Sequence, residues 1–162
     1  MDIVENRFNA VEVIEMAKDI EERGHNFYKN QAEKTQDKEL KKLFSKLAED
    51  ELDHYKRFEE LGNLLKDGSR KELEYVYDPD VSAYLEAIVE FTIFPVDEAV
   101  EIKDIVDAVQ IAIYAEKDSI LFYTEMLEYN EGQTADILKE LIKEEKKHLL
   151  DLVRYDAKLS RK

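Results

Sequence analysis

An internal repeat restricts the fold of this chain more than any other feature of its sequence. Residues 9–54 match residues 104–148 at an offset of about 95 residues, with a difference of one residue in the loop inside each half. The match begins at a residue that can cap a helix, Asn9 in one half and Asp104 in the other. It continues through a Phe-Tyr pair to a Glu-x-x-His motif. Two related halves of this kind predict two similar helical units packed on each other.

Four long segments carry the 3.6-residue period of an amphipathic helix. Asn9 is the predicted N-cap of the first, and Glu12 completes a capping box. The loops inside the two halves, TQD and NEGQT, are short, so each half should be an antiparallel hairpin. The predicted helices cover approximately residues 10–34, 38–66, 105–129 and 135–158.

The segment between the hairpins has a different character. It is long enough to cross from one hairpin to the other, and Asp78 followed by Pro79 predicts the start of a short helix that ends near Phe94. The predicted fold class is therefore all-α. We expect a four-helix bundle of two antiparallel hairpins with one long crossover that contains a short helix.

The composition agrees with this fold class and excludes several functions. Charged residues make up 39% of the chain. The chain has four glycines and two prolines, which are few for the turns that a sheet requires. A length of 162 residues suits a single domain over residues 1–162. The net charge of −15 argues against nucleic acid or an anionic membrane as a partner. We find no signal peptide pattern and no long apolar run, and we expect a soluble, cytoplasmic protein.

Two Glu-x-x-His motifs interrupt the apolar stripes of the second and fourth predicted helices. In each motif the two side chains share one helix face, because residues three apart lie close together on a helix. Glu51 follows Leu47 by four residues, so that Glu51 and His54 should face the core. Glu145 and His148 likewise stand among the Leu and Ile residues of their stripe.

Two further glutamates occupy stripe positions on the first and third predicted helices. Glu21 and Glu116 correspond in the repeat, and each lies between small residues of its stripe. Glu21 and Glu51 are each about fifteen residues from the turn that joins their helices, or roughly 22 Å at 1.5 Å per residue. Glu116 and Glu145 have the same relation to the other turn. All four carboxylates should therefore meet in one layer of the core.

Four buried carboxylates without compensation would take up protons or force the helices apart. Two divalent cations would balance their charge, and imidazole nitrogens would complete the coordination. Oxygen and imidazole donors suit iron or manganese. The chain contains no cysteine, which excludes thiolate ligands. Di-iron and di-manganese bundles use one Glu from each of two helices and a Glu-x-x-His from each of the others. The predicted metal ligands are Glu21, Glu51, His54, Glu116, Glu145 and His148.

Other acidic residues and one further histidine are alternatives that the sequence leaves open. Asp50 and Glu144 each precede a motif histidine by four residues and could be ligands, although they lie about 100° from the stripe. Glu22 is an alternative to Glu21 as the ligand from the first predicted helix. His25 has no counterpart in the second half, so we interpret it as a histidine at the rim or on the surface.

The aromatic residues have two interpretations. Tyr28 and Tyr123 lie seven residues after the predicted ligands of their helices, on the same face. They could pack in the core, or their hydroxyls could hydrogen-bond to metal-bound carboxylates. Phe44, Phe58 and Tyr84 are expected in the core.

The sequence resembles the rubrerythrin-like branch of the ferritin-like superfamily. The resemblance is carried by AKDIEERGHNFY, DELDH, AIYAEKDSILFY and EEKKH, which lie within residues 17–148. It implies a ferritin-like fold and redox chemistry at a di-metal centre, in which iron, or else manganese, reacts with peroxide or dioxygen. It also implies a homodimer.

The chain departs from rubrerythrins in two ways. They carry a second glutamate three residues after the ligand on the third helix, where this chain has Ser119, and a Cys₄ rubredoxin domain, whereas this chain has no cysteine. A peroxidase of this type would need a separate electron donor. The leading hypothesis is a di-iron oxidoreductase in oxidative-stress defence. The alternatives are an iron-binding or ferroxidase protein without substrate turnover, and a helical interaction module with a structural metal site.

Overall fold

The computed structural model describes residues 7–67, 77–91, 94–95 and 104–161. These residues form α-helices and contain no strand, which confirms the all-α prediction. Much of the predicted crossover, residues 68–76, 92–93 and 96–103, lies outside the described residues. The helices are α1 (Ala10–Lys34), α2 (Lys38–Asp67), α4 (Pro79–Phe91), α5 (Ile105–Glu128) and α6 (Gly132–Leu159).

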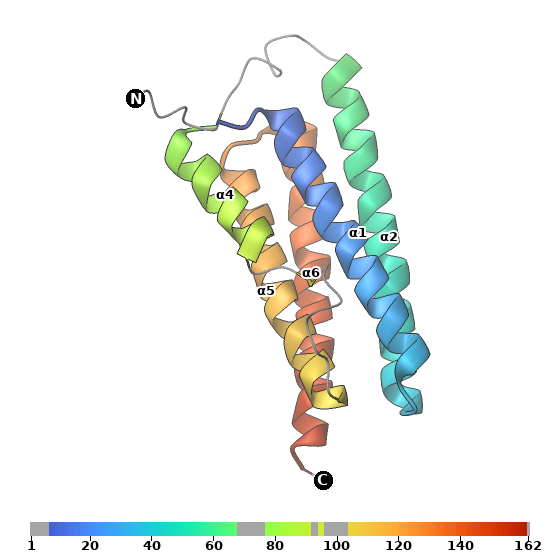
Figure 1. The fold of residues 1–162 in the computed structure, drawn as a ribbon. Coiled ribbons are helices and arrows are strands. Elements are labelled where there is room, and N and C mark those ends of the chain that lie inside the picture. The colour runs from blue at the N-terminus through green and yellow to red at the C-terminus, as the bar shows by residue number, and fades with distance from the viewer. Residues whose placement is uncertain (1–6, 68–76, 92–93, 96–103, 162) are drawn as a thin grey trace.

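The long helices form two antiparallel hairpins that stand side by side (Figure 1). The pair α1 and α2 makes one hairpin, and the pair α5 and α6 makes the other. Between the hairpins, α1 contacts α5 and α2 contacts α6, while the short helix α4 packs beside α5. This confirms the predicted four-helix bundle with a short helix in the crossover.

Capping side chains define where two of the helices begin. The Asn9 side chain accepts a hydrogen bond from the backbone N–H of Glu12, and the Glu12 side chain accepts one from the N–H of Asn9, as the predicted capping box requires. Asp104 caps α5 in the same position of the repeat. The start of α6 was predicted too late, because Gly132 adopts a positive φ of 65° that lets the chain turn directly into the helix.

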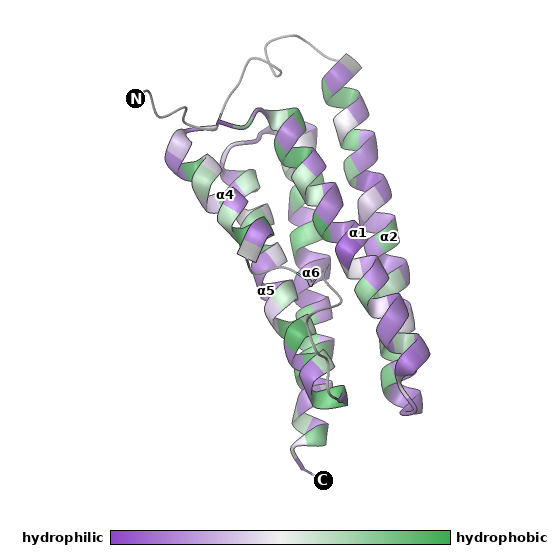
Figure 2. Cartoon of the chain, in the orientation of Figure 1, coloured by the Kyte–Doolittle hydropathy of each residue, from purple (hydrophilic) through white to green (hydrophobic). Residues whose placement is uncertain are grey.

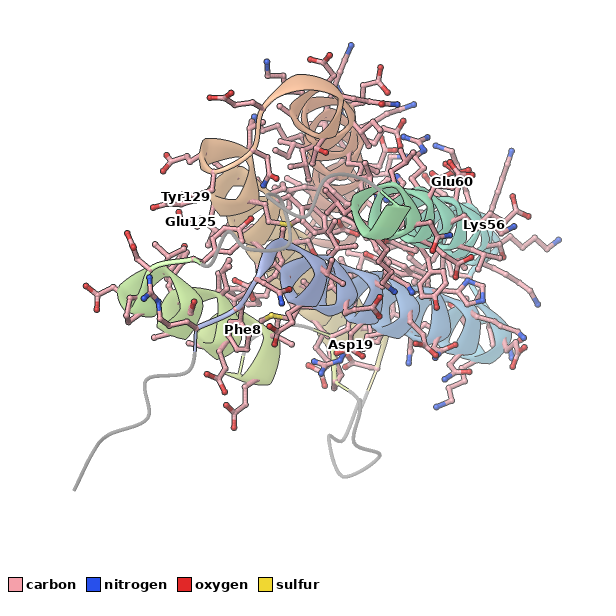
Figure 3. All side chains as sticks on the ribbon, turned by 90° about the horizontal axis from the view of Figure 1, so that it is seen from above. Phe8, Asp19, Lys56, Glu60, Glu125 and Tyr129 are labelled. Carbon is pink, nitrogen blue, oxygen red and sulfur yellow. The ribbon has the colours of Figure 1, made fainter. Side chains whose placement is uncertain are left out.

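Each long helix buries one face and exposes the other, and the hydropathy colours alternate along the helices accordingly (Figure 2). Large side chains from all four long helices fill the space between the hairpins (Figure 3). Phe44 and Phe58 are buried as predicted, but Tyr84 is 41% exposed, so its assignment to the core was wrong. The short helix α4 leaves one side toward solvent, and Tyr84 lies on it.

The outer surface of the bundle carries charged side chains together with some exposed apolar ones, such as Leu64 and Tyr114. Lys56 and Glu60 lie on the side of α2 that faces away from α5 (Figure 3). Among the described helices, none is both long enough and apolar enough to cross a membrane. The cytoplasmic location stays a prediction.

Candidate metal centre

The interior of the bundle contains a cluster of acidic and imidazole side chains from all four long helices. Each long hydrophobic stripe is interrupted at the same height, as the equal distances from the two turns predicted. Every member of the cluster is at most 2% exposed to solvent. The members are the six predicted residues: Glu21 of α1, Glu51 and His54 of α2, Glu116 of α5, and Glu145 and His148 of α6.

The six residues form two overlapping groups that could each hold a metal ion. In each group, four ligand atoms lie within 4.8 Å of one another. One group contains Glu21 and His54, and the other contains Glu116 and His148. Glu51 and Glu145 belong to both groups. A carboxylate has two oxygens, so these two glutamates are placed to bridge neighbouring cations, whereas the other four residues would each serve one.

The two histidines turn Nδ1 toward the cluster and Nε2 toward carboxylates outside it. His54 Nε2 lies 2.6 Å from Glu144 Oε2, and His148 Nε2 lies 3.1 Å from Asp50 Oδ2. An ionised carboxylate only accepts hydrogen bonds, so Nε2 carries a proton and Nδ1 is the nitrogen available to a metal. Asp50 and Glu144, which the sequence left open as ligands, therefore orient the histidines.

Each of these contacts crosses between the hairpins, which sequence spacing alone did not reveal. Glu144 precedes His148 by four residues but binds His54, and Asp50 precedes His54 by four residues but binds His148. The available signal was that Asp50 and Glu144 correspond in the repeat, together with the rule that a metal-binding histidine usually donates its second N–H to a carboxylate.

Two buried tyrosines also connect the hairpins at the cluster. Tyr28 of α1 donates a hydrogen bond of 2.5 Å to Glu116 Oε1 of α5. In the reciprocal contact, Tyr123 of α5 donates to Glu21 Oε1 of α1. Of the two interpretations that the sequence left open for these tyrosines, the structure favours hydrogen bonding to the carboxylates. Each tyrosine leaves the second oxygen of its glutamate without a hydrogen bond.

Two residues singled out in the sequence lie outside both groups. His25 is half-buried, and its Nδ1 contacts the carbonyl oxygen of Ala48 at 2.7 Å, as suits a residue at the rim of the bundle. Ser119 is buried, and its hydroxyl donates to the carbonyl of Ala115, one turn earlier in α5. Ser119 therefore adds no second carboxylate from α5.

Comparison with known proteins agrees with this fold. The sequence matches the model of the family described as Rubrerythrin over residues 12–155. The chain belongs to the rubrerythrin family. A candidate ferritin-like diiron-carboxylate protein from Thermotoga maritima, solved by crystallography, has the same fold, with a TM-score of 0.73 and 24% sequence identity. The similarity covers 94% of this chain and 97% of that chain. No curated protein matched the sequence.

Burial makes two carboxyl groups of this rubrerythrin-family cluster, those of Glu51 and Glu116, hard to ionise. It raises the pKa of Glu51 well above its ordinary value, and the neighbouring Glu145 and Glu21 raise it further. Burial and Glu145 raise the pKa of Glu116 to about 8. Burial and Glu21 also act to raise the pKa of Glu145. Hydrogen bonding with Glu116 and the two imidazoles outweighs them, so the pKa of Glu145 is lowered.

The pKa values of both imidazoles are also raised, although burial acts against the shift here. Burial acts to lower the pKa of His54, but Glu21 and Glu145 outweigh it and raise the pKa to about 11. For His148, hydrogen bonding to Asp50 and to cluster carboxylates outweighs burial and raises the pKa. Without metal, protons on these groups therefore reduce the negative charge of the cluster.

The buried cluster atoms without hydrogen-bond partners also agree with a site for cations. His54 Nδ1 and Glu145 Oε1 approach to 2.6 Å, yet neither has a partner in hydrogen-bond geometry. Buried polar atoms without partners are rare in folded proteins, and an ion that is not part of the polypeptide is one explanation for them. Within the described part of the chain, seven buried cluster atoms have no hydrogen-bond partner: Glu21 Oε2, Glu51 Oε1, His54 Nδ1, Glu116 Oε2, both carboxylate oxygens of Glu145, and His148 Nδ1.

A close packing contact closes the cluster beside α1, and the sequence did not predict it. A Cβ atom on Gly24 would lie 2.9 Å from the ring of Phe94 and 3.3 Å from Glu51 Oε2. Phe94 is 1% exposed and packs on the rings of Phe27 and Tyr28. Only glycine leaves room here for the crossover aromatic ring and the Glu51 carboxylate together.

Proposed function

We propose that this rubrerythrin-family chain is a non-haem di-metal oxidoreductase that uses iron and reacts with peroxide or dioxygen. The observation that carries the proposal is the pair of buried four-residue groups that share Glu51 and Glu145. Four glutamates supply the charge that balances two divalent cations. A site for one cation would need neither the second histidine nor two shared carboxylates.

The proposed role of each residue follows from its group. Glu51 and Glu145 belong to both groups and would serve both cations. Glu21 and His54 would complete one position, and Glu116 and His148 would complete the other, with both histidines offering Nδ1. The distances inside each group support this division.

The donor set accepts iron or manganese, and we favour iron because it changes readily between two oxidation states. Two bound ferrous ions would supply one electron each, which balances the reduction of H₂O₂ and two protons to two water molecules, or of dioxygen and two protons to H₂O₂. A donor must then return two electrons for each turnover. The 162 residues contain no cysteine, so a thiolate-bound iron centre that supplies electrons would lie outside them.

The protein residues would hold this chemistry in place. Tyr28 and Tyr123 fix one oxygen of Glu116 and of Glu21, so that the free oxygen of each carboxylate keeps its direction when charge changes nearby. Phe94 and Glu51 are both buried and both lie against Gly24, so the Phe94 ring would help to keep water away on this side of the cluster. The buried surroundings favour a small oxidant over a bulky one.

Anaerobic loading with ferrous iron tests the proposal. We expect two iron ions per chain and, on addition of H₂O₂ in a stopped-flow spectrometer, oxidation of bound iron faster than that of free ferrous ion. Glu51→Gln is the control with one shared ligand removed. Oxidation no faster than that of free ferrous ion would contradict the proposed reaction.

The same preparation separates the two other functions predicted from the sequence. An iron content far above two per chain, in a cage-forming assembly, would indicate iron storage. Absence of bound metal, with equal melting temperatures before and after metal addition, would indicate a helical interaction module.

A further inference from the structure

The two histidines of the cluster are held unequally, although the repeat relates them. The contact between His54 Nε2 and Glu144 is 2.6 Å long, whereas that between His148 Nε2 and Asp50 is 3.1 Å long. Hydrogen bonds between charged groups are short when their geometry is good, so His54 has the stronger partner. The surroundings of the two carboxylates explain the difference.

Arg57 holds the carboxylate that binds His54. Its Nη2 lies 3.2 Å from Glu144 Oε1 and 2.7 Å from Asp53 Oδ2. Glu144 therefore has both oxygens in contact, one with Arg57 and the other with His54. Because both oxygens are held, the carboxylate has little freedom to rotate away from the imidazole.

Among the described residues, the carboxylate that binds His148 has no comparable support. Lys46 Nζ lies 3.9 Å from Asp50 Oδ2, beyond hydrogen-bond distance, and approaches the same oxygen as His148. In the repeat, the position of Arg57 is taken by Asp151. An ionised aspartate cannot donate a hydrogen bond to Asp50, so the second half of the repeat has no counterpart of the contact between Arg57 and Glu144.

We propose that Arg57 is a positioning residue that makes the Glu21 and His54 half of the cluster the tighter of two cation positions and the first to fill. The inference rests on the proposed function, because it requires that the cluster binds two divalent cations. Arg57 acts through Glu144, which fixes the His54 ring with Nδ1 directed into the cluster before a cation arrives. A ligand held in place loses less conformational entropy on binding.

Titration of the metal-free protein with Mn²⁺, followed by electron paramagnetic resonance, tests the order of filling. We expect the first equivalent to give the signal of an isolated bound ion and the second to convert it to that of a coupled pair. The two dissociation constants should differ about tenfold or more, which is the range produced by a lost outer contact to a metal ligand. His148→Ala should retain the tight step, and His54→Ala should lose it.

Variants at two cationic positions of α2 test the role of Arg57. Arg57→Gln should weaken the first step about tenfold and leave the second within about twofold. Lys46→Gln removes the same charge from the same helix and should leave the first step unchanged. Arg57→Lys keeps the charge and should restore part of the affinity. Circular dichroism checks that each variant keeps its helices.

Three outcomes would overturn the inference: equal dissociation constants in the unmodified protein, an equal loss of both steps in Arg57→Gln, or retention of the tight step in His54→Ala. Failure of the unmodified protein to bind any Mn²⁺ or Fe²⁺ would instead contradict the proposed function, on which this inference depends.

Discussion

Tyr28 on α1 donates a 2.5 Å hydrogen bond to Glu116 on α5, across the interface between the two hairpins. Both residues are fully buried. The contact joins the packing of the bundle to the orientation of a carboxylate in the cluster. Burial and the nearby Glu116 raise the pKa of the Tyr28 hydroxyl well above its ordinary value, so it remains a hydrogen-bond donor at neutral pH.

Tyr28→Phe should lower both stability and metal affinity. The substitution leaves Glu116 Oε1 without its buried donor, and we expect the free energy of unfolding of the metal-free protein to fall by about 1–3 kcal/mol. The less constrained carboxylate should also bind metal less tightly. Urea denaturation and metal titration measure the two effects. Tyr84→Phe, at a site that is 41% exposed, is the control and should change stability by less than about 0.5 kcal/mol.

Glu51→Gln should abolish binding of the metal pair without weakening the metal-free bundle. Glu51 belongs to both ligand groups, and its raised pKa shows that burial disfavours its charge. Glutamine has nearly the same shape and no charge to bury, so the metal-free variant should be at least as stable as the unmodified protein. Elemental analysis and thermal melting measure metal content and stability. Glu49→Gln, on the exposed face of α2, is the control. A large loss of metal-free stability would contradict the assignment.

The metal-free protein should lose stability as pH rises from about 4.5 to 8. The pKa of Glu116 is about 8 in the folded protein and near its ordinary value of 4.5 in the unfolded chain, so between these values the folded state binds more protons. For each extra proton that the folded state binds, a rise of one pH unit lowers the free energy of unfolding by up to about 1.4 kcal/mol. His54, with a folded pKa of about 11, extends the loss from about pH 6.5 to 11.

Chemical denaturation at several pH values checks this dependence. Glu116→Gln removes the first of the two groups and should reduce the slope between pH 5 and 8. Stability that increases with pH over this range in the metal-free protein would contradict the proposed protonation of Glu116.

Two glycines in the same hairpin should respond oppositely to alanine. Gly24→Ala should lower stability, because overpacking against the buried Phe94 ring costs about 1–3 kcal/mol and exceeds the gain in helix propensity. It should also weaken metal binding, since the new methyl group would approach Glu51. Gly62→Ala meets only an ordinary contact with Ile14 at 3.5 Å and should raise stability by about 0.5–1 kcal/mol. Thermal melting of both variants measures the contrast. Equal effects would show that Phe94 does not restrict the position of Gly24.

The sequence was sufficient for the helices and for the height of each predicted ligand. A helix advances by a constant rise and turns by a constant angle, so the period of the apolar residues and the distance from each turn placed Glu21 level with Glu51, and Glu116 level with Glu145. The capping residue Asn9 marked the start of α1 for an equally local reason. The same local logic failed at Tyr84, because the exposure of α4 depends on what packs beside it.

Only the tertiary structure decided how these residues pair across the hairpins. No helical spacing relates Glu144 to His54 or Tyr28 to Glu116, since each contact joins helices far apart in the chain. The identity of the two shared glutamates also depends on how the hairpins approach each other. Local helix geometry therefore determined which side chains point inward and at what height. The packing of one hairpin on the other determined which of them share a cation position and which residues hold them there.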